Sequence, residues 1–395
     1  MIPASTSSAI QQHFLLDGDD TPRAKSTGTK RPAAGIGKDS SGDSDSPSKR
    51  SRSTVSEGSR ASSPTKPNIL RSLQNPIRSE SIDSAKLSDD ARQLVRQVRR
   101  FAAGFETVPQ ALRESMEEAY PDDMDLTQNV TYVPDSQRAS LGDDLSHRDV
   151  ASICRQAQGC QHRNEYEAAW NSHVHGPLLS LVVELSCHKS TVGSTNVTTA
   201  RLNPRFKPMV DISQAPLPGK VVDFVFFLEP SNVTEMEFGA LPWEPNHGHD
   251  FNHILHGPIA NRPIAISMET KREGEGQTTG RTQLDIWVTA QFNRLQELAG
   301  IDTAGLPTLP LLLTQGPAWF LLLAHREQEG EALVTTIFEK ITLGDIARPS
   351  GVFRVVSSLL LLVHWAQTVF RPWFERAVTG EHVVNVQRSI TSTKW

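Results

Sequence analysis

Cysteine and long hydrophobic runs are both scarce in this sequence. The 395 residues include 3 cysteines, Cys154, Cys160 and Cys187. An odd, small number of cysteines argues against a disulfide framework and favours a reducing compartment. The longest apolar runs, such as Leu178–Leu185, fall well short of the ~20 residues that span a bilayer. The sequence therefore predicts a soluble protein with no membrane partner.

Three other signals are missing. The first residues, MIPASTSSAIQQHFLL, have neither a basic n-region nor a long apolar h-region, so no secretory signal is expected. Neither a G-x-G-x-x-G motif nor a P-loop occurs, which argues against a nucleotide cofactor. No internal repeat is present, so a solenoid is not expected.

The N-terminal part of the chain differs in composition from the rest. Residues 21–80 contain 12 Lys or Arg and 5 Asp or Glu, with many Ser, Thr, Pro and Gly and few large apolar residues. Such a segment cannot bury enough apolar surface to offset its chain entropy, so residues 1–86 are predicted to be a disordered basic tail. The net charge of this segment is +7 and that of the whole chain is −5, so the rest of the chain has a net charge of about −12. An acidic body argues against non-specific coating of nucleic acid but allows a narrow basic cleft.

Two basic clusters lie in this tail, Lys30-Arg31 and Lys49-Arg50-Ser51-Arg52. Short Lys/Arg-rich runs can act as nuclear import signals, and they can also be ordinary charged linker. We expect a nuclear protein, and otherwise a cytoplasmic one.

Hydrophobic periodicity predicts one folded domain over residues 87–376, with a catalytic core at about 160–345 and a C-terminal tail at 377–395. Apolar residues at helical spacing predict helices at about 88–105, 108–119, 147–186, 281–298 and 351–369. Short β-branched and aromatic runs predict strands at 220–230, 263–273, 309–314, 318–326 and 334–341. Mixed strands and helices in this order indicate an α/β (α+β) fold, in which helices flank a central mixed sheet.

Charged residues interrupt two of the predicted strands. Asp223 lies within the apolar run VVDFVFF, and Glu269 and Lys271 follow in ISMETKRE. Residues two apart on a strand face the same side, so Glu269 and Lys271 should point into one site. If the two strands are neighbours, Asp223 lies beside Glu269, and two close carboxylates favour a cation between them. Oxygen ligands favour Mg²⁺ or Mn²⁺ over Zn²⁺.

The pattern D-(long loop)-E-x-K resembles the PD-(D/E)XK nuclease superfamily. The segment NEYEAAWNSHVHGPLL resembles the helix that precedes the site in this family, and GRTQLDIWVTAQ resembles the helix that follows the E-x-K strand. The whole set is most similar to uncharacterised fungal PD-(D/E)XK nuclease-like proteins and covers about residues 90–375. The chain departs from the family in one place, because Val222 replaces the proline that precedes the metal-binding Asp.

The resemblance implies a restriction-endonuclease-like fold and a role for each matching residue. Asp223 and Glu269 would bind Mg²⁺ or Mn²⁺, with Glu167 completing the metal site. Lys271 would act at the attacking water, and Gln283 would occupy the auxiliary polar position on the following helix. Glu165 is the alternative to Glu167.

Most of these residues also have a structural interpretation. Asp223 could end a strand, Glu269 and Lys271 could form a surface pair, and Gln283 could be an exposed glutamine. Trp170 and Trp287 are expected to pack in the core rather than stack on bases. Several basic residues could contact phosphates or simply be solvated: Lys220, Arg272 and Arg281.

Two groups of His and Cys residues could suggest zinc. His247, His249, His253 and His256 crowd one loop without a cysteine, so we interpret them as ordinary loop histidines. Cys154, Cys160 and His162 lie in a predicted helix without a second pair of ligands, so we interpret them as structural.

Two functions remain open. The first is a Mg²⁺-dependent nuclease that hydrolyses phosphodiester bonds in nucleic acid, with DNA as the expected substrate. The second is an inactive nuclease fold that binds nucleic acid or protein.

Overall fold

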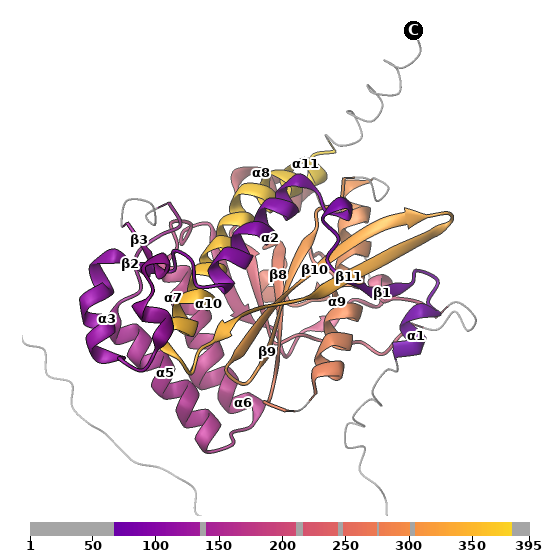
Figure 1. Ribbon diagram of the computed structural model, residues 1–395. Helices are drawn as coiled ribbons and strands as arrows, with labels where there is room; N and C mark the ends of the chain where they lie inside the picture. The colour runs from indigo at the N-terminus through magenta and orange to yellow at the C-terminus, as the bar shows by residue number, and fades with distance from the viewer. Residues whose placement is uncertain are drawn as a thin grey trace, which may run out of the picture. The chain divides into compact units, whose positions relative to one another are not determined.

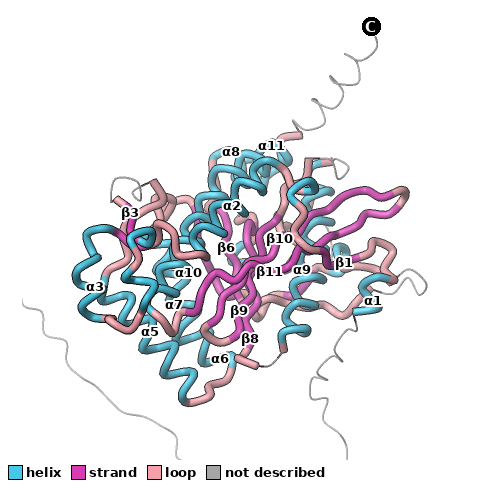
Figure 2. Tube along the Cα trace, in the orientation of Figure 1, coloured by secondary structure: helices cyan, strands magenta, loops and turns pink. Residues whose placement is uncertain are grey.

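A seven-stranded mixed sheet organises the part of the chain that the structure describes. The computed structural model describes residues 67–134, 140–210, 216–243, 248–274, 276–300 and 305–380. The strand order is β1-β11-β10-β9-β8-β6-β4. The strands are β1 (Ile77–Glu80), β4 (Val192–Asn196), β6 (Phe224–Leu228), β8 (Ile264–Lys271), β9 (Leu309–Gln315), β10 (Ala318–Glu329) and β11 (Ala332–Asp345). Figures 1 and 2 show β8, β9, β10 and β11 crossing the centre of the view.

Helices and short strands surround this sheet. The helices are α1 (Pro67–Arg71), α2 (Asp89–Ala102), α3 (Arg113–Ala119), α5 (His147–His162), α6 (Glu167–Trp170), α7 (Gly176–Leu185), α8 (Asn232–Ala240), α9 (Gln277–Ala299), α10 (Pro349–Trp365) and α11 (Arg371–Val378). The short strands pair as β2 (Val108–Pro109) with β3 (Tyr132–Val133), and β5 (Arg201–Leu202) with β7 (Ile254–Leu255).

Three neighbouring strands carry the centre of the sheet. β6 pairs antiparallel with β8, with Phe224 opposite Met268, and β8 pairs parallel with β9. All of β6 is buried, as is β8 except at its last residue, which explains their near-continuous apolar composition. The two strands are therefore neighbours, which is the condition under which Asp223 lies beside Glu269. The predicted α/β fold, with a mixed sheet flanked by helices, is confirmed.

The two faces of the sheet are covered by different helices. α9 packs on β8 and β9, whereas α10 and α2 pack on β11 and on each other. Figure 1 shows α9 on one side of the strands and α10 with α2 on the other. The side chain of Trp287 on α9 donates a hydrogen bond to Ser267 on β8 (Nε1 to Oγ, 2.8 Å), so this helix is fixed against the strand that carries the E-x-K sequence.

The segment Pro349–Val378 is the one helical stretch of the described residues that is long and apolar enough to cross a membrane. It includes α10, a π-helical turn at Ala366–Phe370 and α11. Its length and composition would suit a membrane span, but 67% of its apolar window is buried inside the fold. Burial of this kind is typical of a core helix, and here it covers one face of the sheet.

The long predicted helix at 147–186 is broken at a different place than expected. Gly159 and Gly176-Pro177 are the positions at which the sequence favours a break, but the structure breaks the helix at residues 163–166. Asn164 there has a φ of +52°, a conformation that Asn tolerates better than most residues. From Glu167 onward the chain stays helical to Leu185 and passes through a π-helical turn at Asn171–His175. This wider turn directly precedes Pro177, which lacks the N–H that a regular α-helix would use there.

The disordered tail was predicted to end at residue 86, but the chain forms regular structure from residue 67 onward. Residues 67–86 contain α1, β1 and a 3₁₀ turn. β1 pairs parallel with β11 at the edge of the sheet, and Ile77 is 2% exposed. Composition averaged over the segment could not reveal a single strand that is stabilised by a partner more than 250 residues away. The basic clusters at 30–52 and residues 381–395 lie outside the described residues.

Three further elements differ from the sequence prediction. The predicted helix at 108–119 forms only from Arg113, and β2 precedes it. The segment 231–262 is rich in His, Asn, Gly and Pro, which favours a loop, but it contains α8, whose Ser231 and Thr234 form a capping box. The polar segment before Asp223 forms β4, which pairs with β6. β4 reads VGSTN, and its partner supplies the apolar face that its own sequence lacks.

Candidate active site

Glu269 and Lys271 come together at the end of β8. Both side chains point to the face covered by α9, and the Lys271 ammonium forms an ion pair with Glu269 Oε1. Glu269 is 1% exposed, and the side chain of Lys271 is 11% exposed. Neither carboxylate oxygen of Glu269 has a well-oriented hydrogen bond to any residue that the structure describes. The sequence prediction that these two residues share one site is confirmed by this contact.

Asp223 lies at the entrance of β6 rather than inside it. Its backbone N–H donates to the carbonyl of Met268 (3.0 Å), which places it next to Glu269 on the neighbouring strand. Its carboxylate Oδ2 accepts two hydrogen bonds from Thr270, one from the backbone N–H and one from the hydroxyl, each 2.8 Å. Thr270 was not singled out in the sequence, and it holds one oxygen of Asp223 in place.

Glu167 reaches the same site from the first residue of α6. Its Oε2 accepts a hydrogen bond from Lys271 Nζ at 3.1 Å. Lys271 also donates to the backbone carbonyl of Thr270 at 2.8 Å. The lysine ammonium therefore lies between Glu167 and Glu269 and links the helix to the strand. Glu165, the alternative, pairs with Arg163 at 2.9 Å instead.

The charges in this site act strongly on one another. Burial raises the pKa of Glu269 well above its usual value, and the nearby negative charge of Asp223 raises it further. Burial also raises the pKa of Glu167, although Lys271 partly opposes this. Burial lowers the pKa of Lys271, but Glu269 and Glu167 outweigh it and leave the pKa raised. Two carboxylates, those of Glu269 and Glu167, thus pair with one ammonium, and the charge of Asp223 acts on both of them. Desolvation makes these three negative charges costly without a further cation.

Two glycines at the start of α9 make room for Lys271. A Cβ atom on Gly276, whose φ is +69°, would lie 2.8 Å from Lys271 Cδ. A Cβ atom on Gly280 would lie 2.9 Å from Lys271 Cγ. Side chains at these positions would collide with the lysine stem, so the helix can approach the E-x-K strand only because both are glycine.

Gln283 contacts the backbone near the site instead of the charged cluster. Its Nε2 donates to the carbonyl of Val221 at 3.0 Å, two residues before Asp223. The side chain is partly buried on α9. It therefore fixes the chain that enters β6, and we assign it a positioning role.

The other basic residues that we considered have partners of their own. Arg272 donates to Asn164 Oδ1 at 2.8 Å, and its guanidinium lies 5.3 Å from the ring centroid of Tyr166. Arg281 pairs with Asp285 at 2.8 Å and also donates to Ser79. Lys220 also has a partner. The Tyr166 ring, 74% exposed, was not predicted to matter and lies beside Glu167 in the chain.

The two tryptophans that we expected in the core are there. Trp170 is 2% exposed and stacks on His175, and Trp287 is fully buried. His175 donates from Nε2 to the carbonyl of Gly316, the turn residue whose own N–H donates to the carbonyl of Lys271. Core packing around Trp170 therefore also supports the end of β8.

The histidines of the long loop separate in the structure. His253 is fully buried, where burial lowers its pKa to about 3, and it packs edge-on against Trp287. His249 stacks on Phe238, and His247 lies outside the described residues. Cys154 is buried on α5, where burial raises the pKa of its thiol to about 12.

The donor set at Asp223, Glu269 and Glu167 fits a hard divalent cation. The ligands are carboxylate oxygens, which Mg²⁺ and Mn²⁺ prefer, and the buried carboxylate of Glu269 lacks a well-oriented hydrogen bond among the described residues. The ligand oxygens of the three carboxylates do not all lie within 4.8 Å of one another. Among the His, Cys, Asp and Glu residues of the described chain, only Cys187, His188 and His364 form a group of three as close as that. Lys271 occupies the space between two of the carboxylates.

Comparison with known proteins agrees with this geometry. Residues 115–371, well over half of the chain, match the family model described as the PD-(D/E)XK nuclease superfamily. No curated protein and no solved structure gives a significant match. The chain belongs to the PD-(D/E)XK nuclease superfamily, and it is therefore nuclease-like in a general sense. Nucleases of this superfamily generally use divalent metal ions and bind nucleic acid.

Proposed function

We propose that this protein is a metal-dependent nuclease that hydrolyses phosphodiester bonds in DNA. The observation that carries the proposal is the buried cluster of Asp223, Glu269 and Lys271, in which Glu269 has no well-oriented hydrogen bond within the described part of the chain. Membership of the superfamily supports the class of reaction. Mg²⁺ or Mn²⁺ is the cofactor that the oxygen ligands favour.

The residues of the site have distinct tasks in this proposal. Asp223 and Glu269 would hold the cation, and Glu167 would contribute from α6. A bound divalent cation supplies Lewis acidity at the scissile phosphate and lowers the pKa of a bound water. Lys271 places a positive charge at the same point, where it can hold the attacking water or stabilise charge that develops on the phosphate oxygens. Thr270 and Gln283 position Asp223.

An aromatic and basic pair beside the site supports nucleic acid as the substrate. Tyr166 is 74% exposed, and the Arg272 guanidinium lies over its ring. These residues adjoin Glu167 and Lys271 in the chain. An exposed aromatic ring can stack on a base, and an arginine can contact a phosphate.

A cleavage assay with purified protein tests the proposal. We expect nicking or degradation of plasmid DNA in the presence of Mg²⁺ or Mn²⁺ and none with EDTA. Glu269→Gln and Lys271→Met should each lower the single-turnover rate by at least ~100-fold, because each removes a charge at the reacting phosphate. Glu339→Gln is a matched control, since Glu339 lies exposed on β11, away from the site. Cleavage that persists in Glu269→Gln would contradict the proposal.

An inactive nuclease fold that binds nucleic acid or protein is the second candidate. One observation favours it: Lys271 bridges Glu167 and Glu269, and the carboxylates do not converge on one point. In that case Mn²⁺ should not bind at Asp223, and DNA binding should be the same with and without metal. Electrophoretic mobility shifts of a DNA duplex with Mn²⁺ or EDTA separate the two candidates.

We also propose that the basic clusters at 30–31 and 49–52 direct the protein to the nucleus. A deletion that tests this should remove residues 1–66 and keep β1, because β1 completes the sheet edge with β11. Loss of nuclear accumulation with retained cleavage activity is the expected result. Unchanged localisation would contradict the proposal.

A further inference from the structure

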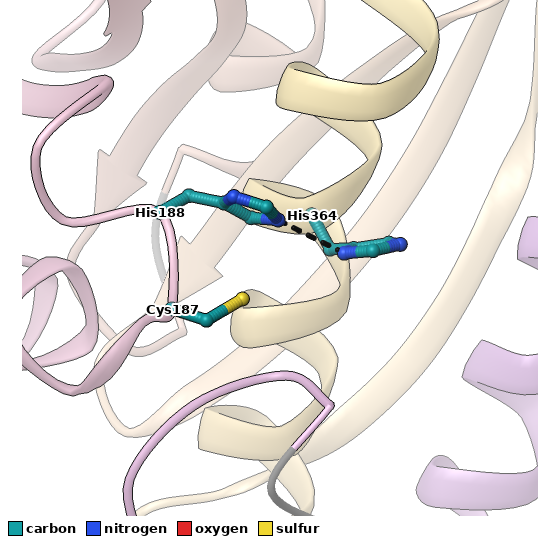
Figure 3. Close-up of side chains that lie close together, drawn as sticks. All are labelled: Cys187, His188 and His364. Carbon is teal, nitrogen blue, oxygen red and sulfur yellow. Dashed lines mark hydrogen bonds between the residues drawn. The ribbon is translucent and has the colours of Figure 1, made fainter.

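Cys187, His188 and His364 form a group of potential metal ligands away from the carboxylate cluster. The Sγ atom and one nitrogen of each imidazole all lie within 4.8 Å of one another. His188 Nε2 and His364 Nδ1 are 3.0 Å apart. Figure 3 shows two of these side chains coming from the loop that follows α7 and the third from α10. Only their spatial arrangement reveals this group, because 176 residues separate the two histidines in the sequence.

We propose that these three residues bind a transition-metal ion of the zinc type. A thiolate with two imidazoles is a donor set that Zn²⁺ prefers over Mg²⁺ or Mn²⁺. Bonds of 2.0–2.1 Å from Zn²⁺ to nitrogen place two nitrogens about 3.3 Å apart in a tetrahedral site. The observed nitrogen separation differs from this by a few tenths of an ångström, which small rotations of the imidazoles can supply.

The backbone around the ligands is fixed, so the group is preorganised. The N–H of Cys187 donates to the carbonyl of Leu141 (3.1 Å), and Gly142 forms a bridge with Ser186. The carbonyl of His188 accepts hydrogen bonds from Thr191 and Val192. His364 lies in the last turn of the core helix α10, and the chain stays helical beyond it through a π-helical turn into α11. Ordering three ligands before binding lowers the entropy that the metal must offset.

The charged groups near these ligands are the cation Arg371 and the thiol of Cys187, which can become a thiolate. Arg371 lies near His188 and opposes positive charge there, but its guanidinium donates to the carbonyls of Thr191 and Glu229. A deprotonated Cys187 would offset one of the two charges of the ion.

The site would also be open on one side. Cys187 is exposed, and His364 lines a cavity of about 410 Å³ between α2 and α10 that Ser140 and Leu141 also border. With three protein ligands, a fourth position remains for water or a small anion, as in open zinc sites. A bound ion would tie the end of the helical run that starts at Glu167 to α10.

Cobalt spectroscopy tests this proposal. Co²⁺ added to the metal-free, untagged protein should give one equivalent of a thiolate-to-cobalt charge-transfer band. Cys187→Ser should abolish the band, whereas His173→Gln, which changes an exposed histidine elsewhere on the same helical run, should keep it. Absence of the band in the wild-type protein, or its survival in Cys187→Ser, would overturn the proposal.

A thermal measurement with Zn²⁺ gives a second readout. Saturating Zn²⁺ should raise the Tm of the wild-type protein by about 3–5 °C and leave that of Cys187→Ser unchanged. Glu269→Gln should keep the full Zn²⁺ effect, because the carboxylate cluster is a separate site. A Zn²⁺ effect of equal size in Cys187→Ser would show that the ion binds elsewhere and would contradict the assignment.

Discussion

Gly280 on α9 lies directly against the side chain of Lys271 on β8, and a Cβ atom at Gly280 would be 2.9 Å from Lys271 Cγ. The same Cβ would lie 3.1 Å from Leu313 Cδ1 and 3.4 Å from Glu269 Cγ. A side chain at position 280 would push on Lys271 Cγ, and this atom cannot move without displacing the ammonium group at the end of the same side chain. The packing of α9 therefore determines where the positive charge of the site lies.

We predict that Gly280→Ala lowers cleavage by about 10–100-fold, since small misplacements of a catalytic group are costly. Alanine normally stabilises a helix interior by about 0.5–1 kcal/mol relative to glycine. Gly239→Ala on α8 is the matched control, because a Cβ there meets nothing within 4 Å. Gly239→Ala should retain activity and stability. Equal activity of Gly280→Ala and the wild-type protein would show that Lys271 is not constrained in this way.

The hydroxyl of Thr270 provides a second test of positioning. Thr270→Val removes one of the two hydrogen bonds to Asp223 Oδ2 and keeps the backbone one. A hydrogen bond to a charged group contributes about 1.5–3 kcal/mol. We expect a weaker apparent affinity for Mn²⁺ in the cleavage assay, with far-UV circular dichroism unchanged. Thr270→Ser should restore the wild-type apparent affinity for Mn²⁺. Equal apparent affinities of Thr270→Val and Thr270→Ser would contradict this role.

The buried Asp250 predicts how stability depends on pH. Burial raises its pKa from 3.8 to about 8, against the opposing hydrogen bond from Asn252. The folded state therefore holds a proton that the unfolded state releases above pH 3.8. The stabilisation is complete below that pH, declines as the pH rises, and is lost once the pH passes about 8.

Urea unfolding of the wild-type protein and Asp250→Asn at pH 5, 7 and 9 measures this effect. Asparagine keeps an acceptor for the Asn252 N–H and has no proton to lose. The free energy of unfolding of the wild-type protein should fall relative to that of the variant, by at most about 1.4 kcal/mol per pH unit. A difference between the two proteins that stays constant with pH would refute the assignment.

The sequence was sufficient for the elements whose apolar pattern is strong. β6, β8 and α9 have long apolar or amphipathic runs, and their positions followed from the sequence within a few residues. The positions of β4 and β1 could not be predicted in this way, because their residues are mostly polar and they form by pairing with strands that are distant in the sequence. The break at Asn164 was also missed, because its positive φ depends on how α5 turns into α6.

The same distinction holds for the active site. Glu269 and Lys271 could be placed together because strand periodicity requires it, and the family resemblance added Glu167 and Gln283. The contribution of Thr270 could have been suspected, because it follows Glu269 and faces the neighbouring strand. The sequence around Gly280 does not indicate its role. A glycine is required there because α9 packs against the side chain of Lys271 on β8. The metal roles of Glu167, Asp223 and Glu269 remain predictions.

Calorimetric titration of the protein with Mn²⁺ tests the central claim most directly. The titration should use the Cys187→Ser background, so that any ion bound by the cysteine and histidine group is excluded. We predict one Mn²⁺ site that is lost in both Glu269→Gln and Asp223→Asn and kept in Glu339→Gln. Binding that is unchanged by both substitutions, or no binding at all, would contradict the account.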